Sequence, residues 1–335
     1  MRIGEVARQS GVSARMLRHY ESVGLVRPTG RTSAGYREYS SEDLRLIFQV
    51  ESLRSLGLSL RDVQRALDDP AFTPSGLVAD LISQTRRRIA GELELLTRLR
   101  RIDAAEPADW ADVLQIVALL QALGSASAGR RQRAALSSVD EAPVPVEALV
   151  EAALNETDPN VAGALRWALA QLGDDGLALL ADGLDAPVAE VRERAVRAIA
   201  EVPTANGTAL LQDALANPDI VVRRRAALTL GPRGVAEAVP TLVDMVVEEA
   251  NDVDAADALS ALASDPALAE QIATRLVDRL AHGPVGSSVR RRLAQALADI
   301  PGRTAARALV DLAQDDDRAV ALTATYILQV RADSP

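Results

Sequence analysis

A pattern of about 31 residues repeats through the C-terminal two thirds of this 335-residue chain. Each copy has an apolar stretch, a short turn with Asp, Asn or Pro, and a second stretch rich in Ala and Leu. Successive valines that open the second stretch are 30, 31, 31, 36 and 31 residues apart: Val161, Val191, Val222, Val253, Val289 and Val320. Repeats of this kind stack so that neighbouring helix pairs bury a shared core. The sequence therefore predicts an α-solenoid of about seven helix pairs, with an earlier copy centred near Arg130.

The clearest copies resemble bacterial HEAT-like repeats, in which V-R-x-x-A-A-x-A-L is a common motif. They lie at 185–202, 217–231, 286–300 and 315–328. The fifth unit departs, because Asp254 replaces the arginine after the valine and the next interval is longer, so repeat boundaries over 250–290 stay open. Alanine lets helices approach closely, which suits a core with few aromatic residues. We expect Trp110 and Trp167 to be packing residues.

Charged residues recur at fixed places in the repeats and have two interpretations. The arginines Arg192, Arg223 and Arg290 either form a ladder with turn carboxylates of neighbouring repeats or belong to binding clusters at 223–225 and 290–292. The acidic run 315–317 suggests a metal, but acids in a helix-connecting turn more often cap a helix.

The N-terminal residues predict a helix-turn-helix. Apolar residues recur at helical spacing from Ile3 to Ala7, and Gly11 can take the positive φ that ends a helix. Ser13 is a good N-cap for a second helix, in which Met16, Leu17 and Tyr20 form an apolar stripe. The outer face of that helix is polar and basic, which is typical of a helix that enters the DNA major groove.

A small hairpin is expected next, with Gly30 and Gly35 on either side of its loop and strand-like Tyr36 and Tyr39. A third helix begins at Ser40 or Ser41 and ends at Gly57, with three residues turned inward: Leu44, Ile47 and Phe48. A capping pattern at 59–62 starts a fourth helix that reaches about Asp69.

Residues 1–70 resemble the DNA-binding domain of MerR-family regulators, through IGEVARQSGVSARMLRHYESVGLVRP, GYREYSSEDL and LRSLGLSLRDVQ in that order. The resemblance implies a dimer that binds a near-palindromic promoter and distorts an over-long spacer for RNA polymerase. Carried over by position, four residues face the groove: Ser13, Arg15, Arg18 and His19. Four others hold phosphates: Tyr20, Arg31, Tyr36 and Arg37. Tyr20 and Tyr36 have the alternative of being core residues, His19 that of a plain surface residue, and Tyr39 is expected in the core.

A long helical pattern at 76–103 carries apolar residues near a 3.5-residue repeat. Its proposed contact residues are Leu81, Ile82, Ile89, Leu93, Leu96 and Leu99. In the resembled family a helix at this place forms an antiparallel coiled coil with the dimer partner. The alternative is that it packs onto the C-terminal domain.

The charge of the chain divides at this helix. Residues 1–102 hold 17 arginines against 12 acidic residues, whereas the rest of the chain has a net charge of −15. This asymmetry favours double-stranded DNA as a partner of the N-terminal part only. The chain has no cysteine and only two histidines, His19 and His282, so we expect no thiolate metal site, no cofactor and no catalytic residues.

The predicted fold is mainly α, with a winged helix-turn-helix at 1–72, a dimerisation helix at 73–106 and a HEAT-like solenoid at 107–335. We expect a cytoplasmic, non-enzymatic transcription regulator, without a membrane-spanning segment, whose solenoid senses a protein, peptide or small-molecule effector. One alternative is a solenoid that clamps DNA or polymerase without sensing. A remote one is DNA glycosylase activity, since some glycosylases have HEAT-like repeats.

Overall fold

The computed structural model describes residues 1–68, 74–139, 144–281 and 286–333. Contacts divide the chain into two compact units, Met1–Leu95 and Leu96–Pro335. Regular structure in both units is almost entirely helical, as the repeats and helical spacings predict. Among the described helices, none has the length and apolar character that crossing a membrane requires.

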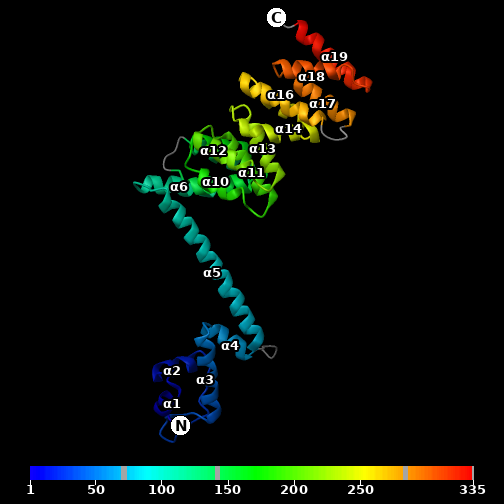
Figure 1. The fold of residues 1–335 in the computed structure, drawn as a ribbon. Helices are drawn as coiled ribbons and strands as arrows, with labels where there is room; N and C mark the ends of the chain where they lie inside the picture. Colours follow the sequence, from blue (N-terminus) through cyan, green and yellow to red (C-terminus); the bar gives the residue numbers. More distant parts are fainter. Residues whose placement is uncertain (69–73, 140–143, 282–285, 334–335) are drawn as a thin grey trace. The chain divides into compact units, whose positions relative to one another are not determined.

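The first unit contains the predicted helix-turn-helix, whose helices are labelled in Figure 1, and the predicted hairpin. Its elements are α1 (Ile3–Ser10), α2 (Ala14–Ser22), β1 (Gly30–Arg31), β2 (Arg37–Glu38), α3 (Ser41–Ser55), α4 (Leu60–Asp68) and the first part of α5 (Pro74–Ala104). Gly11 ends α1 with φ of 73°, and the Ser13 side chain accepts a hydrogen bond from the Met16 backbone N–H at 3.2 Å. Turn and cap are therefore as predicted, while the predicted end of the fourth helix at Asp69 lies outside the described residues.

The hairpin is short and is attached to the N-terminus of the chain. Gly30 pairs with Glu38 and Arg31 with Arg37 in antiparallel register, and Arg2 forms an isolated bridge to Glu38. The Met1 ammonium group donates to the Tyr39 carbonyl at 2.8 Å. This bridge and this hydrogen bond connect the hairpin to the residues just before α1.

The core of the first unit lies where α1, α2, α3 and α4 meet. Its most buried residues are Val6, Leu17, Tyr20, Val26, Tyr39, Ile47, Val50 and Val63. The core position expected for Tyr39 is confirmed. The prediction that Phe48 turns inward is wrong, because this residue is 45% exposed. It directly follows the buried Ile47 on α3 and so faces another side of the helix.

The second unit is a stack of seven helix pairs within the described residues, from α6 to α19 in chain order (Figure 1). The first helices of the pairs are α6 (Trp110–Leu123), α8 (Val146–Asn155), α10 (Leu177–Gly183), α12 (Ala205–Ala214), α14 (Val239–Glu248), α16 (Pro266–Ala281) and α18 (Arg303–Leu312). The second helices are α7 (Ala128–Ser137), α9 (Pro159–Gln171), α11 (Ala189–Glu201), α13 (Ile220–Leu230), α15 (Asp252–Leu262), α17 (Ser287–Leu297) and α19 (Arg318–Asp333). A 3₁₀ turn, η1 (Ala236–Ala238), precedes α14.

Small residues set the spacing of the helices in this stack. A Cβ atom on Gly183 would lie 2.9 Å from the Ala195 Cβ, and one on Gly231 would lie 2.7 Å from the Ala258 Cβ. Real Cβ atoms do not approach so closely, so larger residues would force the helices apart. The shared core is correspondingly rich in alanine and leucine.

The repeat alignment is wrong at one valine. Val161, Val222 and Val320 are fully buried at the start of their helices, but Val253 is 69% exposed and Ala255 is buried in its place. Glu249 and Asn251 have φ of 59° and 51° in the turn before α15. These left-handed residues change how the turn enters the helix, which puts a different face of α15 toward the core.

The recurring arginines connect neighbouring repeats as a ladder. Arg192 donates to Asp219 at 2.7 Å, and Arg290 makes two bonds to Asp315 at 2.8 and 3.0 Å. The same kind of contact occurs two repeats before that of Arg192, between Arg131 of α7 and Glu156. The ladder interpretation is therefore confirmed for Arg192 and Arg290.

Arg223 departs from the ladder and bonds its own turn instead. It donates to the Asn217 and Pro218 carbonyl oxygens at 2.7 and 2.9 Å. In the acidic run, Asp315 pairs with Arg290, while Asp317 accepts from the backbone N–H groups of Ala319 and Val320. Helix capping and repeat pairing thus account for these two acids.

The two tryptophans correct a prediction. Trp110 is 80% exposed and Trp167 is 43% exposed, so Trp110 does not pack in the core and Trp167 does so only in part. Trp110 begins α6, the first helix of the stack, where no earlier pair of the described solenoid covers its side chain.

The ladder predicts acid sensitivity of the solenoid. The hydrogen bond from Arg131 lowers the pKa of the Glu156 carboxyl, and that from Arg290 lowers the pKa of Asp315. A carboxyl whose pKa is lower in the folded state stabilises the fold above its unfolded pKa of about 4, and this contribution is lost as the pH falls through the folded pKa. A Glu156→Gln, Asp315→Asn variant should therefore be less stable at neutral pH and lose less stability between about pH 5 and pH 3.

Urea unfolding at several pH values measures this difference. The control variant is Glu147→Gln, Asp316→Asn, which changes two exposed carboxylates. Parallel pH profiles for the parent chain and both variants would contradict the prediction.

Candidate nucleic-acid interface

Helix α2 presents one apolar face and one polar face. Leu17 and Tyr20 are buried against the core, whereas Arg15, Arg18 and His19 are exposed. Ser13 stands at the N-terminus of the helix, exposed, with its hydroxyl engaged as the cap. The hydroxyl of Ser22 donates to the His19 carbonyl oxygen at 2.7 Å. The outward residues are those that sequence reasoning assigned to base contact.

Arginines from three elements meet in one groove of about 750 Å³ beside this helix. It is lined by Arg2, Ile3, Gly4, Glu5, Arg8, Arg18, Gly35, Tyr36 and Arg37. Arg2 and Arg8 come from the start of the chain and α1, Arg18 from α2, and Arg37 from the hairpin. Four guanidinium groups and one carboxylate line the groove, which gives it an excess of positive charge, and the fork of an arginine matches a phosphate.

Two contacts hold the hairpin side of this groove. Arg37 Nε donates to the Glu21 carboxylate of α2 at 2.5 Å. The Arg2 guanidinium lies 5.9 Å from the centre of the Tyr36 ring, within cation–π distance, and Tyr36 itself is 63% exposed. The ion pair orients Arg37 and offsets part of its charge, so Arg2, Arg8 and Arg18 are the cations that remain for an anionic ligand.

Tyr20 does not belong to this surface. Its side chain is fully buried, and its hydroxyl donates to Glu51 and accepts from Arg54 at 2.6 Å. Burial, with the hydrogen bond to Glu51, raises the pKa of the tyrosine hydroxyl. Of the two interpretations open for Tyr20, the core one fits, and we withdraw it from the phosphate contacts.

Comparison with known proteins agrees with this geometry. A family model described as MerR HTH family regulatory protein matches residues 1–69, and one described as HEAT repeats matches residues 177–263. The uncharacterized HTH-type transcriptional regulator PA4778 of Pseudomonas aeruginosa is 38% identical over 102 residues, which cover 30% of this chain and 77% of that protein. The chain belongs to the MerR family.

Another relative and a solved structure match a similar share of the chain. Nodulation protein NolA of Bradyrhizobium sp. strain NC92 is 37% identical over 99 residues, 30% of this chain, and the match spans only 40% of its length. Among solved structures, the N-terminal part of MtaN, the Bacillus subtilis multidrug transporter activator, is 29% identical over 30% of this chain and 96% of its own, with a TM-score of 0.28. The Pseudomonas aeruginosa relative is named as an HTH-type transcriptional regulator, and MerR-family regulators bind DNA.

The predicted residues of this MerR-family domain fall into two groups. Arg18, Tyr36 and Arg37 line the common groove, whereas the others lie on exposed surface outside it: Ser13, Arg15 and His19 on or beside α2, and Arg31 on β1. Sequence reasoning missed Arg2 and Arg8. The available signal was the charge of α1, because Arg8 lies off the apolar face formed by Ile3, Val6 and Ala7.

The predicted dimerisation residues lie along α5. Five of them are 41–57% exposed, namely Ile82, Ile89, Leu93, Leu96 and Leu99, while Leu81 is partly buried against the core of the first unit. An apolar seam of this length on a solvent-facing helix is costly unless another surface covers it. The seam is thus available for a partner helix.

Proposed function

We propose that this chain is a homodimeric transcription regulator that binds a near-palindromic promoter and distorts its spacer. In this proposal residues 1–72 bind DNA, residues 73–106 pair the two chains, and residues 107–335 receive an effector signal. The protein acts in the cytoplasm with RNA polymerase as a partner, without a cofactor or catalytic activity of its own.

The observation that carries the proposal is the groove with Arg2, Arg8, Arg18 and Arg37 on three elements next to α2. Phosphate contacts fix the register of a protein on DNA, and side chains in the major groove read the bases. The groove supplies the first kind of contact, so Arg18, which was expected to face the bases, is proposed as a phosphate contact instead. Ser13, Arg15 and His19 on the exposed side of α2 supply the second.

Dimerisation is proposed through the exposed seam of α5. Two such helices can cover each other's apolar residues as an antiparallel coiled coil, whose knobs-into-holes packing suits the 3.5-residue spacing. A symmetric dimer would present two copies of α2 to two half-sites, which is why a near-palindrome is expected.

The effector role of the solenoid is proposed from its architecture. Stacked helix pairs offer extended surfaces for binding. An effector can shift the DNA-bound state only by binding one arrangement of the dimer better than the other. The net charge of −15 over residues 103–335 disfavours broad DNA contact by the solenoid itself.

Selection of binding sites from a random-sequence pool of duplex DNA by the full chain tests the proposal. We expect enriched inverted repeats, and genomic promoters that contain them should have spacers longer than those of ordinary promoters. Chemical footprinting should show distortion at the spacer centre. Enrichment of single half-sites would overturn the dimeric mode, and ordinary spacers throughout would overturn spacer distortion.

A further inference from the structure

The outer surface of the first helix pair is apolar and exposed. Trp110 and Leu114, one turn apart on α6, are 80% and 66% exposed, and Leu136 of α7 is 42% exposed. The end repeats of solenoids normally carry a polar outer face that keeps them soluble. Within the described residues no repeat precedes this pair, and its outer surface does not have that polar character.

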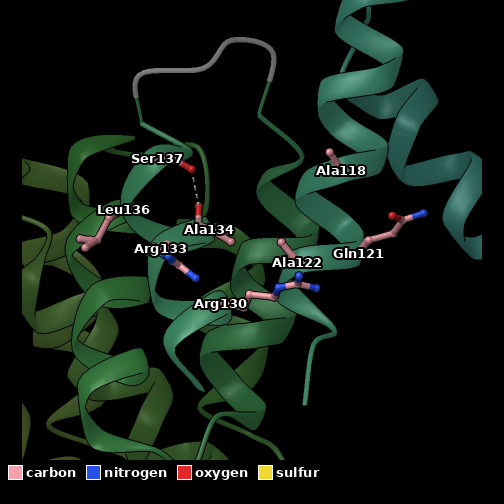
Figure 2. A pocket seen from close by; sticks show the side chains of 8 residues that line it. All are labelled: Ala118, Gln121, Ala122, Arg130, Arg133, Ala134, Leu136 and Ser137. Atoms are coloured by element: carbon pink, nitrogen blue, oxygen red, sulfur yellow. Dashed lines mark hydrogen bonds between the residues drawn. The ribbon is translucent and has the colours of Figure 1, made fainter. Parts of the chain in front are cut away.

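A groove of about 710 Å³ lies between the two helices of this pair (Figure 2). It is lined by Ala118, Gln121 and Ala122 of α6 and by Arg130, Arg133, Ala134, Leu136 and Ser137 of α7. Figure 2 shows the side chains of Arg130 and Arg133 directed from α7 into the space between the helices. The groove therefore combines a floor of alanines with two cations.

The two alanines at the floor of the groove have counterparts in a later helix pair, where the structure shows which side chain packs against them. Ala122 and Ala134 are twelve residues apart, as are Gly183 and Ala195 of the pair α10 and α11. There, Leu154 of the preceding helix α8 packs over the close contact, with its methyl groups 3.3 Å from where a Cβ on Gly183 would be. By this register, the groove has the position that the first helix of a preceding repeat occupies elsewhere.

Two counterparts of Arg133 hold the end of such a helix. Arg133 stands two residues after Arg131, as Arg194 does after Arg192 and Arg292 after Arg290, whereas Arg225 of α13 has the same position without a side-chain hydrogen bond in the described part of the chain. Arg194 donates to the Leu154 carbonyl oxygen near the end of α8 at 2.8 Å. Arg292 donates at 2.8–2.9 Å to two carbonyl oxygens at the end of α14 and to the carboxylate of Glu249. Arg133 has no such bond within the described residues.

Arg130 adds a second charge where other repeats have none. Its counterparts are Val191, Val222 and Val289, of which Val222 is fully buried and Val289 packs against the shared core. The groove thus bears two arginines at the place where a helix would end, in a domain that is otherwise strongly acidic. A helix C-terminus carries partial negative charge, and acidic side chains there would add to the attraction.

We propose that the groove between α6 and α7 binds an amphipathic α-helix of a partner protein, with a leucine over Ala122 and Ala134 and an acidic C-terminal end against Arg130 and Arg133. The bound helix takes the place of a preceding repeat and extends the solenoid by one helix. Its role as an effector signal rests on the proposed sensing function of the solenoid. The binding itself involves no DNA, so its failure would leave the DNA-binding proposal standing.

The test uses a helix that already fills the equivalent groove in this protein. A fluorescein-labelled peptide with the sequence 145–156 carries a hydrocarbon staple between positions 147 and 151, which are exposed in α8. Anisotropy titration with the full chain should show saturable binding. Arg133→Ala should weaken it about tenfold or more, as expected for loss of charge-assisted hydrogen bonds. The control Arg197→Ala removes an exposed arginine of α11 and should leave affinity unchanged.

Two further variants separate the alternatives. A peptide with Leu154→Ser should bind more weakly, because it loses the side chain that packs on the alanine floor. Absence of saturation up to about 1 mM peptide, or equal affinity for the Arg133→Ala chain, would overturn the proposal. Sedimentation of a Leu114→Asp, Leu136→Asp variant tests a second copy of the chain as occupant. If these changes dissociate an existing assembly, the surface is an interface between copies and the partner helix is rejected.

Discussion

Replacing Arg2, Arg8 and Arg18 together by alanine is expected to weaken DNA binding about a hundredfold at low salt. The three guanidinium groups line one groove and, unlike Arg37, make no ion pair there within the described residues. Each phosphate contact releases counterions, so losing three should make the slope of log affinity against log salt less negative by about 3. The loss should be similar for specific and random sequences, because these contacts position the protein and do not read bases.

Anisotropy titrations at several salt concentrations, with a duplex selected by the protein and with a random duplex, measure both quantities. The matched control is Arg303→Ala, Arg307→Ala, Arg318→Ala, which removes three exposed arginines from the solenoid with the same change in net charge. An unchanged salt slope in the groove variant would show that phosphates bind elsewhere. Equal losses of affinity in both variants would mean that the change in net charge alone weakens DNA binding.

Local patterns were sufficient to predict most elements of the first unit. The turn at Gly11, the cap at Ser13 and the apolar stripe of α2 depend on residues within one or two helical turns, and each is found where expected. The same stripe also indicated that Tyr20 is a core residue, since it shares a face with the buried Leu17. The phosphate role for Tyr20 came from resemblance rather than from this pattern.

The groove itself could not be predicted from periodicity. Arg2 and Arg8 join Arg18 and Arg37 only because the start of the chain bridges to the hairpin, a contact between residues 36 positions apart in the sequence. A helical pattern assigns Arg8 to a polar face but does not say which neighbouring element that face meets. Long-range contacts of this kind depend on the tertiary arrangement.

In the solenoid, the repeat period predicted the architecture but not its exceptions. Val253 carries the expected residue type, yet two left-handed residues in the preceding turn change which side chain of α15 reaches the core. Trp110 is of a residue type that usually packs in a core, but it lies on α6, the first helix of the stack. A repeat alignment compares residue types and therefore misses both turn geometry and end effects.

Replacing Arg292 by alanine is expected to lower the free energy of unfolding of the solenoid by about 3 kcal/mol. The side chain is 10% exposed and donates to the Val246 and Val247 carbonyl oxygens at the end of α14. Hydrogen bonds from a charged donor contribute about 1.5–3 kcal/mol each, and the two acceptors belong to a different repeat, so the loss uncouples two helix pairs. The ion pair with Glu249 adds little, because that carboxylate is 70% exposed.

Arg225 is the matched control, because it occupies the equivalent position of α13 and its side chain makes no hydrogen bond in the described part of the chain. Arg225→Ala should therefore change stability by less than about 1 kcal/mol. Urea unfolding followed by far-UV circular dichroism compares the two variants with the parent chain. Equal effects would mean that Arg292 acts through packing of its aliphatic part alone, and would remove the basis for assigning helix-end recognition to Arg133 in the first repeat.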